Sequence, residues 1–268
     1  MNKKIGFIGC GKMASAIIGG VLTANYLSKE NILATEINEE KAHEKANNLG
    51  IKVITDNLEL VNSSDIIFVS TVPSCVEGVL EEIKDSVTKD KLVVSIAAGV
   101  TTNFISSILG EDKRVVRVMP NTPALVLEGM SGVAGGKGAS EEDVDLVVEL
   151  LSNIGKAIKV DEAQIDIVTA ISGSGPAFYY KVINDIARAG EKLGLDYEKA
   201  LTLSIQTAIG SAKMLLASDK SAEELIASVA TKGGCTRVGV DYMEEIDTSD
   251  IFYNLIDKTA TKANALGK

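Results

Sequence analysis

The residues best spaced for chemistry form the stretch GCGKMA at residues 9–14. It follows the apolar run Lys4–Ile8, a predicted strand, and it leads into the helical pattern Met13–Ala24. In a G-x-G-x-x-A turn, Gly9 would allow the tight turn, Gly11 would let a pyrophosphate approach the backbone, and Ala14 would let the helix pack closely. The helix N-terminus would then offer N–H groups to the phosphates. The alternative is a strand–turn–helix unit without a ligand.

A second strand, Ile32–Glu36, ends on an acidic residue, and this context favours the dinucleotide. Glu36 could accept hydrogen bonds from the ribose hydroxyls of an adenosine. It would repel a 2′-phosphate by roughly 4 kcal/mol at about 4 Å and an effective dielectric constant near 20. No Arg stands at positions 35–40 to reverse this, so we predict that NADH is preferred to NADPH. The alternative is a solvated Glu36, with phosphate contacts made by Lys41 or by another segment.

Composition excludes several other chemistries. The 268 residues include one histidine, His43, within a charged run, so Ser-His-Asp hydrolysis and His-rich metal sites lack their parts. No metal site is predicted. A net charge of −10 argues against nucleic-acid binding. Three cysteines without a CxxC pair favour a reducing compartment, and we expect a cytoplasmic protein without signal peptide or membrane span.

Apolar runs alternate with helical patterns over the first part of the chain, which predicts an α/β Rossmann domain with a mostly parallel, doubly wound sheet over residues 1–161. Runs that do not alternate with polar residues, such as IIFV at 66–69, are typical of strands buried on both faces. The predicted strands are Lys4–Ile8, Ile32–Glu36, Asp65–Thr71, Lys91–Ala97, Val115–Val118, Ser131–Ala134 and Ala157–Val160. The helices predicted between them are Met13–Ala24, Glu39–Asn48, Ser74–Asp85, Thr101–Leu109 and Glu141–Asn153.

Strand signals end near residue 161, and residues 162–268 are predicted to form an all-helical domain. Asp196, and Ser221 with Glu224, are predicted caps. The predicted helices are Ala163–Ile171, Pro176–Leu193, Tyr197–Ala217, Ala222–Val229, Arg237–Glu245 and Ser249–Leu266. Apolar rows at helical spacing, such as Leu201, Ile205 and Ile209, are either core or interface.

Six stretches together resemble the pyrroline-5-carboxylate reductase family, the enzymes of the last step of proline synthesis. They are IGFIGCGKMA at 5–14, DIIFVSTVP at 65–73, VSIAAGV at 94–100, RVVRVMPNTP at 114–123, ISGSGPAF at 171–178 and ATKGGCTRVG at 230–239. The last three are more specific than a Rossmann turn. The resemblance covers nearly the whole chain. It implies that residues 162–268 are a substrate and dimerisation domain. It also implies reduction of 1-pyrroline-5-carboxylate to proline with hydride from NADH or NADPH, in at least a homodimer.

The resemblance also assigns residues. The cofactor set that it implies is Gly9, Gly11, Lys12, Met13, Asn57 near the adenosine, Thr71, Val72, Pro73, Ala97, Ala98 and Asn121, beside Glu36 from the argument above. The substrate set is Gly233, Gly234, Cys235 and Thr236, which would hold the substrate carboxylate on backbone N–H groups, with the Thr236 hydroxyl near the ring nitrogen as the catalytic group.

Chemistry supports that substrate set independently, because a planar imine with an acidic group needs an anion pocket, and glycines before a helix start can provide one. On turn chemistry alone, Gly233 and Gly234 would more often form only a turn between helices. Glu162 could approach the substrate nitrogen, or it could cap the helix that follows it. The stretch Gly173–Pro176 predicts a kink or a helix break.

Four positions depart from the family pattern: Lys12 where Asn is frequent, Val72 where Lys is frequent, Lys232 where Pro is common and Cys235 where Thr is common. Two alternatives to the family activity therefore remain. One is a related reductase of a different cyclic imine. The other is a nucleotide-binding regulatory protein without turnover. The argument against it is the presence of Asn121, Gly233, Gly234 and Thr236. The sequence leaves open the assembly beyond a dimer and any feedback by proline.

Overall fold

The computed structural model describes residues 3–266. Within that range it contains one eight-stranded sheet with the strand order β3-β2-β1-β4-β5-β6-β7-β8. All pairs are parallel except β6 with β7, which is antiparallel, so the predicted mostly parallel Rossmann sheet is confirmed. The strands are β1 (Ile5–Ile8), β2 (Ile32–Thr35), β3 (Lys52–Ile54), β4 (Ile66–Val69), β5 (Leu92–Ser95), β6 (Arg114–Met119), β7 (Gly129–Gly135) and β8 (Gly155–Lys159).

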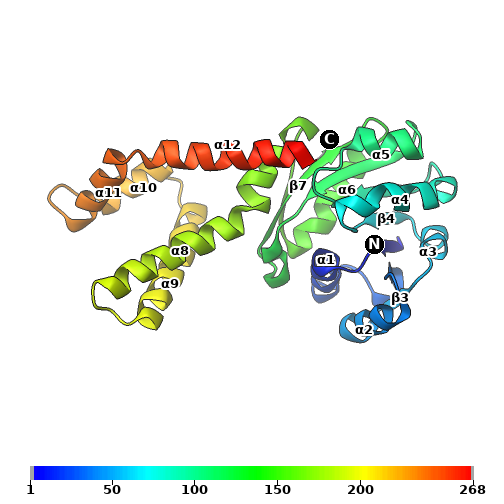
Figure 1. Cartoon of the computed structure of the whole chain (residues 1–268), viewed down its shortest axis with the longest axis horizontal. Coiled ribbons are helices and arrows are strands. Elements are labelled where there is room, and N and C mark those ends of the chain that lie inside the picture. The colour runs from blue at the N-terminus through cyan, green and yellow to red at the C-terminus, as the bar shows by residue number, and fades with distance from the viewer. Residues whose placement is uncertain (1–2, 267–268) are drawn as a thin grey trace. The chain divides into compact units, whose positions relative to one another are not determined.

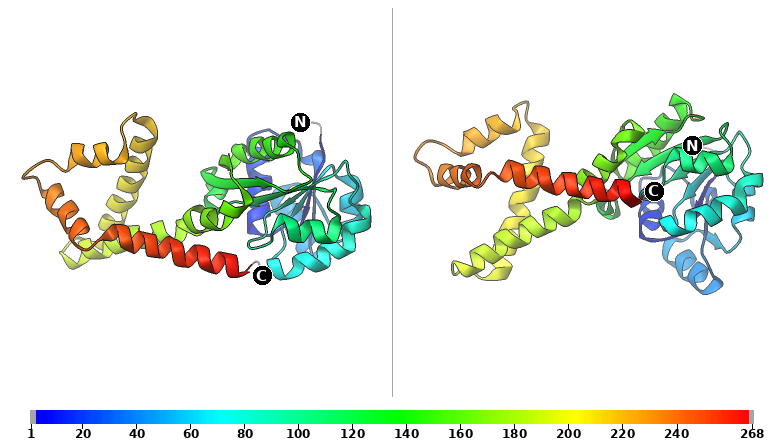
Figure 2. Two further views of the ribbon diagram at one scale, coloured as in Figure 1. Left: turned by 90° about the horizontal axis from the view of Figure 1, so that it is seen from above. Right: turned by 45° about the horizontal axis from the view of Figure 1, so that its top comes forward.

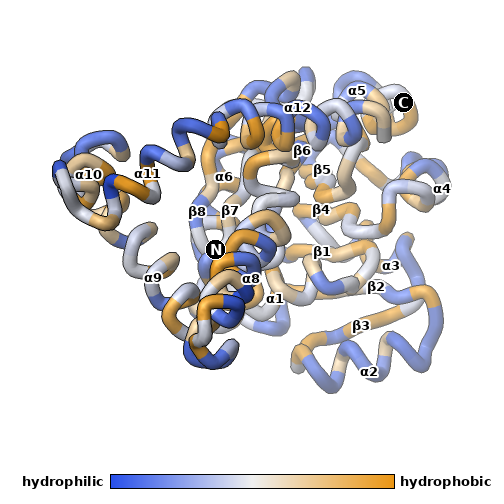
Figure 3. Tube along the Cα trace, turned by 60° about the vertical axis from the view of Figure 1, so that its left-hand side comes forward, coloured by the Kyte–Doolittle hydropathy of each residue, from blue (hydrophilic) through white to orange (hydrophobic). Residues whose placement is uncertain are grey.

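Helices cover both faces of this sheet (Figure 2). One apolar cluster joins it to α1 (Lys12–Thr23) and α6 (Glu141–Leu151). The other joins it to α3 (Asn57–Ser63), α4 (Pro73–Ile83) and α5 (Thr102–Leu109). Helix α2 (Glu39–Leu49) is mostly hydrophilic and buries only Ala42, whereas β1, β4 and β5 are strongly hydrophobic (Figure 3).

The central strands are buried on both faces, as their continuous apolar runs predicted. In β4, Ile66 and Phe68 belong to one cluster and Ile67 to the other. Phe68 stacks on Phe7 of β1 with ring centroids 4.7 Å apart. This core fixes the C-terminal ends of β1, β2 and β4 at one edge, where ligands of open α/β sheets bind.

Besides short 3-10 helices, one strand and one α-helix were missing from the sequence prediction: β3 and α3. Strand β3 is a three-residue edge strand, and α3 is a two-turn helix. Both are too short to show a period in the sequence. Asp56 caps α3 by accepting a hydrogen bond from the N–H of Glu59 at 2.9 Å. Together they bring Asn57 to the same edge as the glycine turn.

By contacts between Cα atoms, the chain divides into two units. One runs through Ser174 and resumes at Lys258, and the other is Gly175–Asp257. This division differs from the expected boundary at 161/162, because residues 162–174 pack with the sheet. A π-helical turn, η6 (Thr169–Gly173), stands just before the division, which confirms the predicted helix break.

The second unit is helical throughout, with α8 (Gly175–Lys192), α9 (Tyr197–Ala217), α10 (Ala222–Val229), α11 (Cys235–Glu245) and the start of α12 (Thr248–Leu266) (Figure 1). The predicted caps are confirmed: the Asp196 carboxylate accepts from the N–H of Lys199 at 3.2 Å, and Ser221 forms a capping box with Glu224. Helices α8 and α9 pack together, with the Arg188 guanidinium 4.0 Å from the ring centroid of Tyr197.

Large apolar side chains of this unit are exposed in the single chain. Ile205 is 42% exposed and Ile209 is 44% exposed, so the apolar row of α9 does not lie in the core of its own chain. Such a surface is typical of a protein–protein interface. Helix α9 is also long and apolar enough to pass a test for a membrane span by length and composition, where the sequence analysis expected none; this is weak evidence for a membrane.

Candidate functional site

The glycine turn has the backbone geometry that a dinucleotide requires. Gly9 has φ +88°, and a Cβ there would lie 3.1 Å from the Ser70 carbonyl oxygen. Gly11 is the N-cap of α1, and a Cβ there would meet nothing within 4 Å. The backbone is therefore open to a ligand at Gly11 and tightly packed at Gly9, as the predicted roles of the two glycines require.

Beside these glycines, Lys12 is exposed on the first turn of α1, and Met13 is half-buried against the core. Cys10 is fully buried below the turn. Burial raises the pKa of its thiol above the usual range, although a hydrogen bond with Ser15 opposes the shift. Cys10 is therefore a neutral packing residue and not a nucleophile.

The end of β2 is hydrogen-bonded to the glycine turn. The Glu36 carboxylate accepts from the N–H of Cys10 at 3.2 Å and from the N–H of Ile37 at 3.3 Å. The Thr35 hydroxyl accepts from the N–H of Gly9 at 3.4 Å and donates to the Asn57 side-chain oxygen at 2.7 Å. The structure thus brings the predicted adenosine residues Glu36 and Asn57 next to the turn. The sequence analysis did not find Thr35, although its place beside Glu36 was a usable signal.

The loop after β4 lies against the same turn. Thr71 approaches Gly9 through its methyl group, and its buried hydroxyl has no hydrogen-bond partner among the described residues. Val72 is 62% exposed and is the N-cap of α4, with Pro73 at the first helical position. An exposed apolar residue at this edge fits packing against a flat ligand.

The end of β5 contributes Ala97, which is 5% exposed, and the half-buried Ala98. Asn121 is buried at the end of β6. Its side-chain oxygen accepts from the N–H of Met130 at 2.8 Å, and its amide nitrogen donates to the carbonyl of Ser172 at 3.0 Å. Asn121 therefore ties β6 to β7 and to η6, and its contact with a cofactor stays a prediction.

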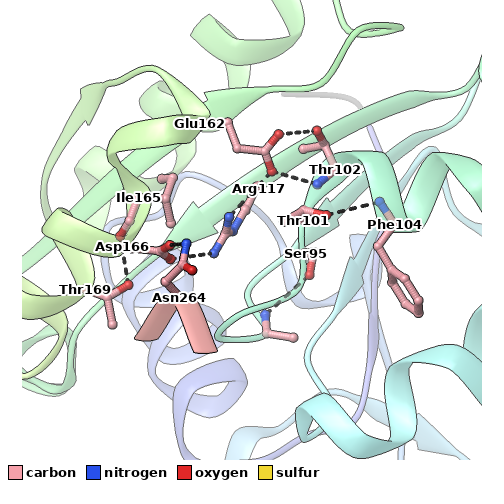
Figure 4. A network of polar contacts seen from close by, with 11 residues as sticks. Ser95, Thr101, Thr102, Phe104, Arg117, Glu162, Ile165, Asp166, Thr169 and Asn264 are labelled. Atoms are coloured by element: carbon pink, nitrogen blue, oxygen red, sulfur yellow. Dashed lines mark hydrogen bonds and ion pairs between the residues drawn. The ribbon is translucent and has the colours of Figure 1, made fainter. Parts of the chain in front are cut away.

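Glu162 lies in a polar network around Arg117 (Figure 4). Its carboxylate accepts from the backbone N–H and the hydroxyl of Thr102, at the start of α5, and lies 3.5 Å from the Arg117 guanidinium. Arg117 is also 3.5 Å from Asp166, which accepts from Asn264 of α12 at 3.0 Å. Glu162 thus holds the start of α5.

The second alternative raised for Glu162, capping of the helix that follows it, is wrong: Glu162 is the first residue of η5 (Glu162–Gln164), and Asp161 is its N-cap. Asp161 forms a capping box with Gln164 across η5. The predicted approach of Glu162 to a substrate stays a prediction, and any such contact would compete with Thr102 and Arg117 for the same carboxylate oxygens.

The four residues of the predicted anion pocket lie together in the second unit, at the start of a helix. Gly233 has φ +79°, and Gly234 is the N-cap of α11, so Cys235 and Thr236 form its first turn. The first N–H groups of a helix lack partners within the helix and attract anions. Thr236 is exposed and lines a mostly apolar cavity of about 590 Å³ formed with α9 and α10.

The remaining titratable side chains bear on the predicted absence of a histidine or metal site. His43 is exposed on α2, which fits the predicted solvated face. Among residues 3–266, no group of three or more His, Cys, Asp and Glu side chains has the geometry of a metal site.

A family model described as "NADP oxidoreductase coenzyme F420-dependent" matches residues 4–99. A second, described as "Pyrroline-5-carboxylate reductase dimerisation", matches residues 162–266. The sheet, its glycine turn and the first match define a nicotinamide-dependent oxidoreductase with a Rossmann domain.

Comparisons over the whole length specify the family. The chain is 41% identical to a pyrroline-5-carboxylate reductase of Methanosarcina acetivorans, over 100% of this chain and 99% of the relative. It matches the solved Coxiella burnetii enzyme of that name with a TM-score of 0.94 at 32% identity, covering 100% of both chains. It matches a Plasmodium falciparum pyrroline carboxylate reductase with NADP bound, with a TM-score of 0.89 at 32% identity, over 100% and 99% of the chains. The chain belongs to the pyrroline-5-carboxylate reductase family.

Proposed function

We propose that this protein reduces 1-pyrroline-5-carboxylate to L-proline with NADH or NADPH, in the last step of proline synthesis. The observation that supports the proposal is that one chain of this family has both a glycine turn, at Gly9 and Gly11, that could receive a dinucleotide and a glycine–helix start, at residues 233–236, that could hold an anion. A bound nicotinamide would supply the hydride for the C=N bond.

The chain's own residues would bind and orient the substrate. Backbone N–H groups at the start of α11 would hold its carboxylate, and the Thr236 hydroxyl would hydrogen-bond the ring nitrogen, whose proton the product keeps. Hydride addition to a protonated C=N bond needs no strong base, so orientation would provide most of the rate.

The cofactor preference that we propose is NADH. Glu36 supports it, because its carboxylate lies on the N–H of Cys10, at the place where the ribose end of a dinucleotide would meet the turn. A 2′-phosphate there would face the negative charge of the Glu36 carboxylate.

We propose a homodimer at least, in which the exposed apolar row of α9 is covered by the partner; a higher homo-oligomer would bury more of it. The dimerisation model over residues 162–266 supports this assembly. The three free cysteines support a reducing compartment such as the cytoplasm.

Paired variants of Thr236 test the proposed chemistry. Thr236→Val should lower kcat by roughly 10- to 100-fold, the worth of a hydrogen bond to a charged group. Thr236→Ser should retain most of the activity, and neither change should alter the Kd for NADH. An unchanged kcat in Thr236→Val would refute the assignment. Turnover of pyrroline-2-carboxylate without turnover of 1-pyrroline-5-carboxylate would favour a different cyclic imine, which the departures at Lys232 and Cys235 make worth testing.

A further inference from the structure

We propose that Glu82, near the end of α4, is a positioning residue for the adenosine half of the dinucleotide and acts through Asn57. The inference rests on the proposed dinucleotide site and on the placement of the adenosine beside Asn57. Nothing in the sequence pattern marks Glu82, which is an exposed residue on an ordinary amphipathic helix.

The carrying observation is a continuous chain of hydrogen bonds from the glycine turn to Glu82. The N–H of Gly9 donates to the Thr35 hydroxyl at 3.4 Å, and that hydroxyl donates to the Asn57 side-chain oxygen at 2.7 Å. The Asn57 amide nitrogen then donates to a carboxylate oxygen of Glu82 at 2.9 Å. These hydrogen bonds join the turn after β1 to β2, α3 and α4, which are separate elements along the sequence.

All three hydrogen bonds run in the same direction from donor to acceptor, and the last acceptor is a negatively charged carboxylate. Hydrogen bonds aligned in this way polarise one another. The carboxylate accepts only, so it must face the amide nitrogen of Asn57, and the amide oxygen must then face Thr35. Glu82 therefore determines which way the Asn57 amide points.

That choice matters because the terminal torsion of an Asn side chain is otherwise broad. Thr35 is 2% exposed and is fixed in the core, whereas Asn57 is only half-buried at the first position of α3. With Glu82 in place, the amide is held before a ligand arrives, and its second N–H is left for that ligand. Preorganisation of this kind improves affinity by reducing the entropy lost on binding.

A purely structural tie between α3 and α4 is the competing explanation, and a truncated cofactor separates the two. Reduced nicotinamide mononucleotide carries the reacting ring but no adenosine. A positioning role predicts that kcat/KM falls with NADH and does not fall with the mononucleotide. A structural role predicts equal losses with both donors or a lower Tm.

The variants are Glu82→Met, which removes the acceptor, and Glu82→Gln, which keeps an acceptor without the charge. Glu81→Met is the matched control, because Glu81 is the exposed neighbour whose carboxylate pairs with Lys84 at 2.7 Å instead. We expect Glu82→Met to raise the Kd for ADP-ribose, measured by calorimetry, and the KM for NADH by about three- to tenfold, with kcat unchanged. Glu82→Gln should recover part of the affinity, and Glu81→Met should match the wild type.

An unchanged Kd for ADP-ribose in Glu82→Met would overturn the proposal. So would an equal loss of kcat/KM with the mononucleotide, or an equal effect of Glu81→Met. ADP-ribose binding needs no imine, so it can be measured independently of the proposed substrate. A wild-type protein that binds ADP-ribose tightly but does not reduce 1-pyrroline-5-carboxylate would refute the proposed substrate. The role of Glu82 would then still be decided by the calorimetric Kd values.

Discussion

Adding one methyl group at Gly11 should separate cofactor binding from folding. The backbone of Gly11 has φ −69° and ψ −173°, which any residue adopts, and a Cβ there would meet no atom of the protein within 4 Å. The folded chain therefore has room for Gly11→Ala. The same methyl would stand where a pyrophosphate must approach the backbone.

The expected magnitudes follow from these contacts. Ala is a poorer N-cap than Gly, which costs up to about 1 kcal/mol. The loss of flexibility in the unfolded chain returns about 0.4–1 kcal/mol. The free energy of unfolding should therefore change by less than about 1 kcal/mol, whereas displacing a phosphate from an N–H group should cost about 1.5–3 kcal/mol, or roughly 10- to 150-fold in Kd.

Two neighbouring glycines serve as controls. Gly9→Ala should lose both stability and affinity, because Gly9 has φ +88° and a Cβ there would lie 3.1 Å from the Ser70 carbonyl oxygen. Gly19→Ala adds its methyl inside α1, with nothing within 4 Å, and should gain up to about 1 kcal/mol without changing affinity.

The assay is calorimetric titration of each variant with NADH, beside thermal unfolding of the free proteins. An affinity of Gly11→Ala equal to that of the wild type would refute the placement of the pyrophosphate. A fall in Tm by more than about 5 °C would refute the claim that the position is open in the folded protein.

Three further predictions concern charge, pH and packing. Glu36→Gln, which keeps an acceptor for the Cys10 N–H, should raise the NADPH-to-NADH ratio of kcat/KM by roughly tenfold or more, since solvent and salt reduce the estimated 4 kcal/mol repulsion; a wild type that already strongly prefers NADPH would contradict it. Burial alone would raise the pKa of Asp143, but the hydrogen bonds and charge of Arg114 lower it below its usual value. The contribution of Asp143 to the free energy of unfolding is therefore complete above about pH 4 and is lost as the pH falls through the folded-state pKa. Asp143→Asn should therefore cost about 1–3 kcal/mol in urea unfolding at pH 7 and progressively less below pH 4, and a gap independent of pH would count against this ion pair. Gly155→Ala should destabilise by more than about 3 kcal/mol in the same assay, because Gly155 has φ +144° and a Cβ would lie 2.0 Å from the Gly129 carbonyl oxygen; a soluble variant of wild-type stability would contradict that geometry.

Much of the first unit was predictable, because buried parallel strands and amphipathic helices repeat over enough residues to show their period. Strand β3 and helix α3 were not, since three and seven residues carry too little pattern. Missing α3 also affected the predicted site, because α3 begins at Asn57, the residue predicted to lie near the adenosine.

A second limit on prediction from the sequence is set by contacts between residues that are far apart along the chain. The sequence analysis allowed Glu162 to cap the helix that follows it, because capping rules connect residues a few positions apart. In the structure Asp161 is the cap, and Glu162 accepts a hydrogen bond from the N–H of Thr102, 60 positions away. The chain of bonds that ends at Glu82 was invisible for the same reason.

The apolar row of α9 shows a third limit. A helical period identifies an apolar face but not what covers it. Exposure of about two-fifths at Ile205 and Ile209 shows that the single chain does not cover this face, and the match to a dimerisation model supports a homodimer or larger oligomer.

The most direct test of the account follows the hydride. The protein is incubated with 1-pyrroline-5-carboxylate and NADH deuterated at both C4 positions, and the proline formed is examined by NMR and mass spectrometry. The account predicts proline with one deuterium, located at C5. Cofactor oxidation without labelled proline, or no reaction while a different cyclic imine is reduced, would contradict it.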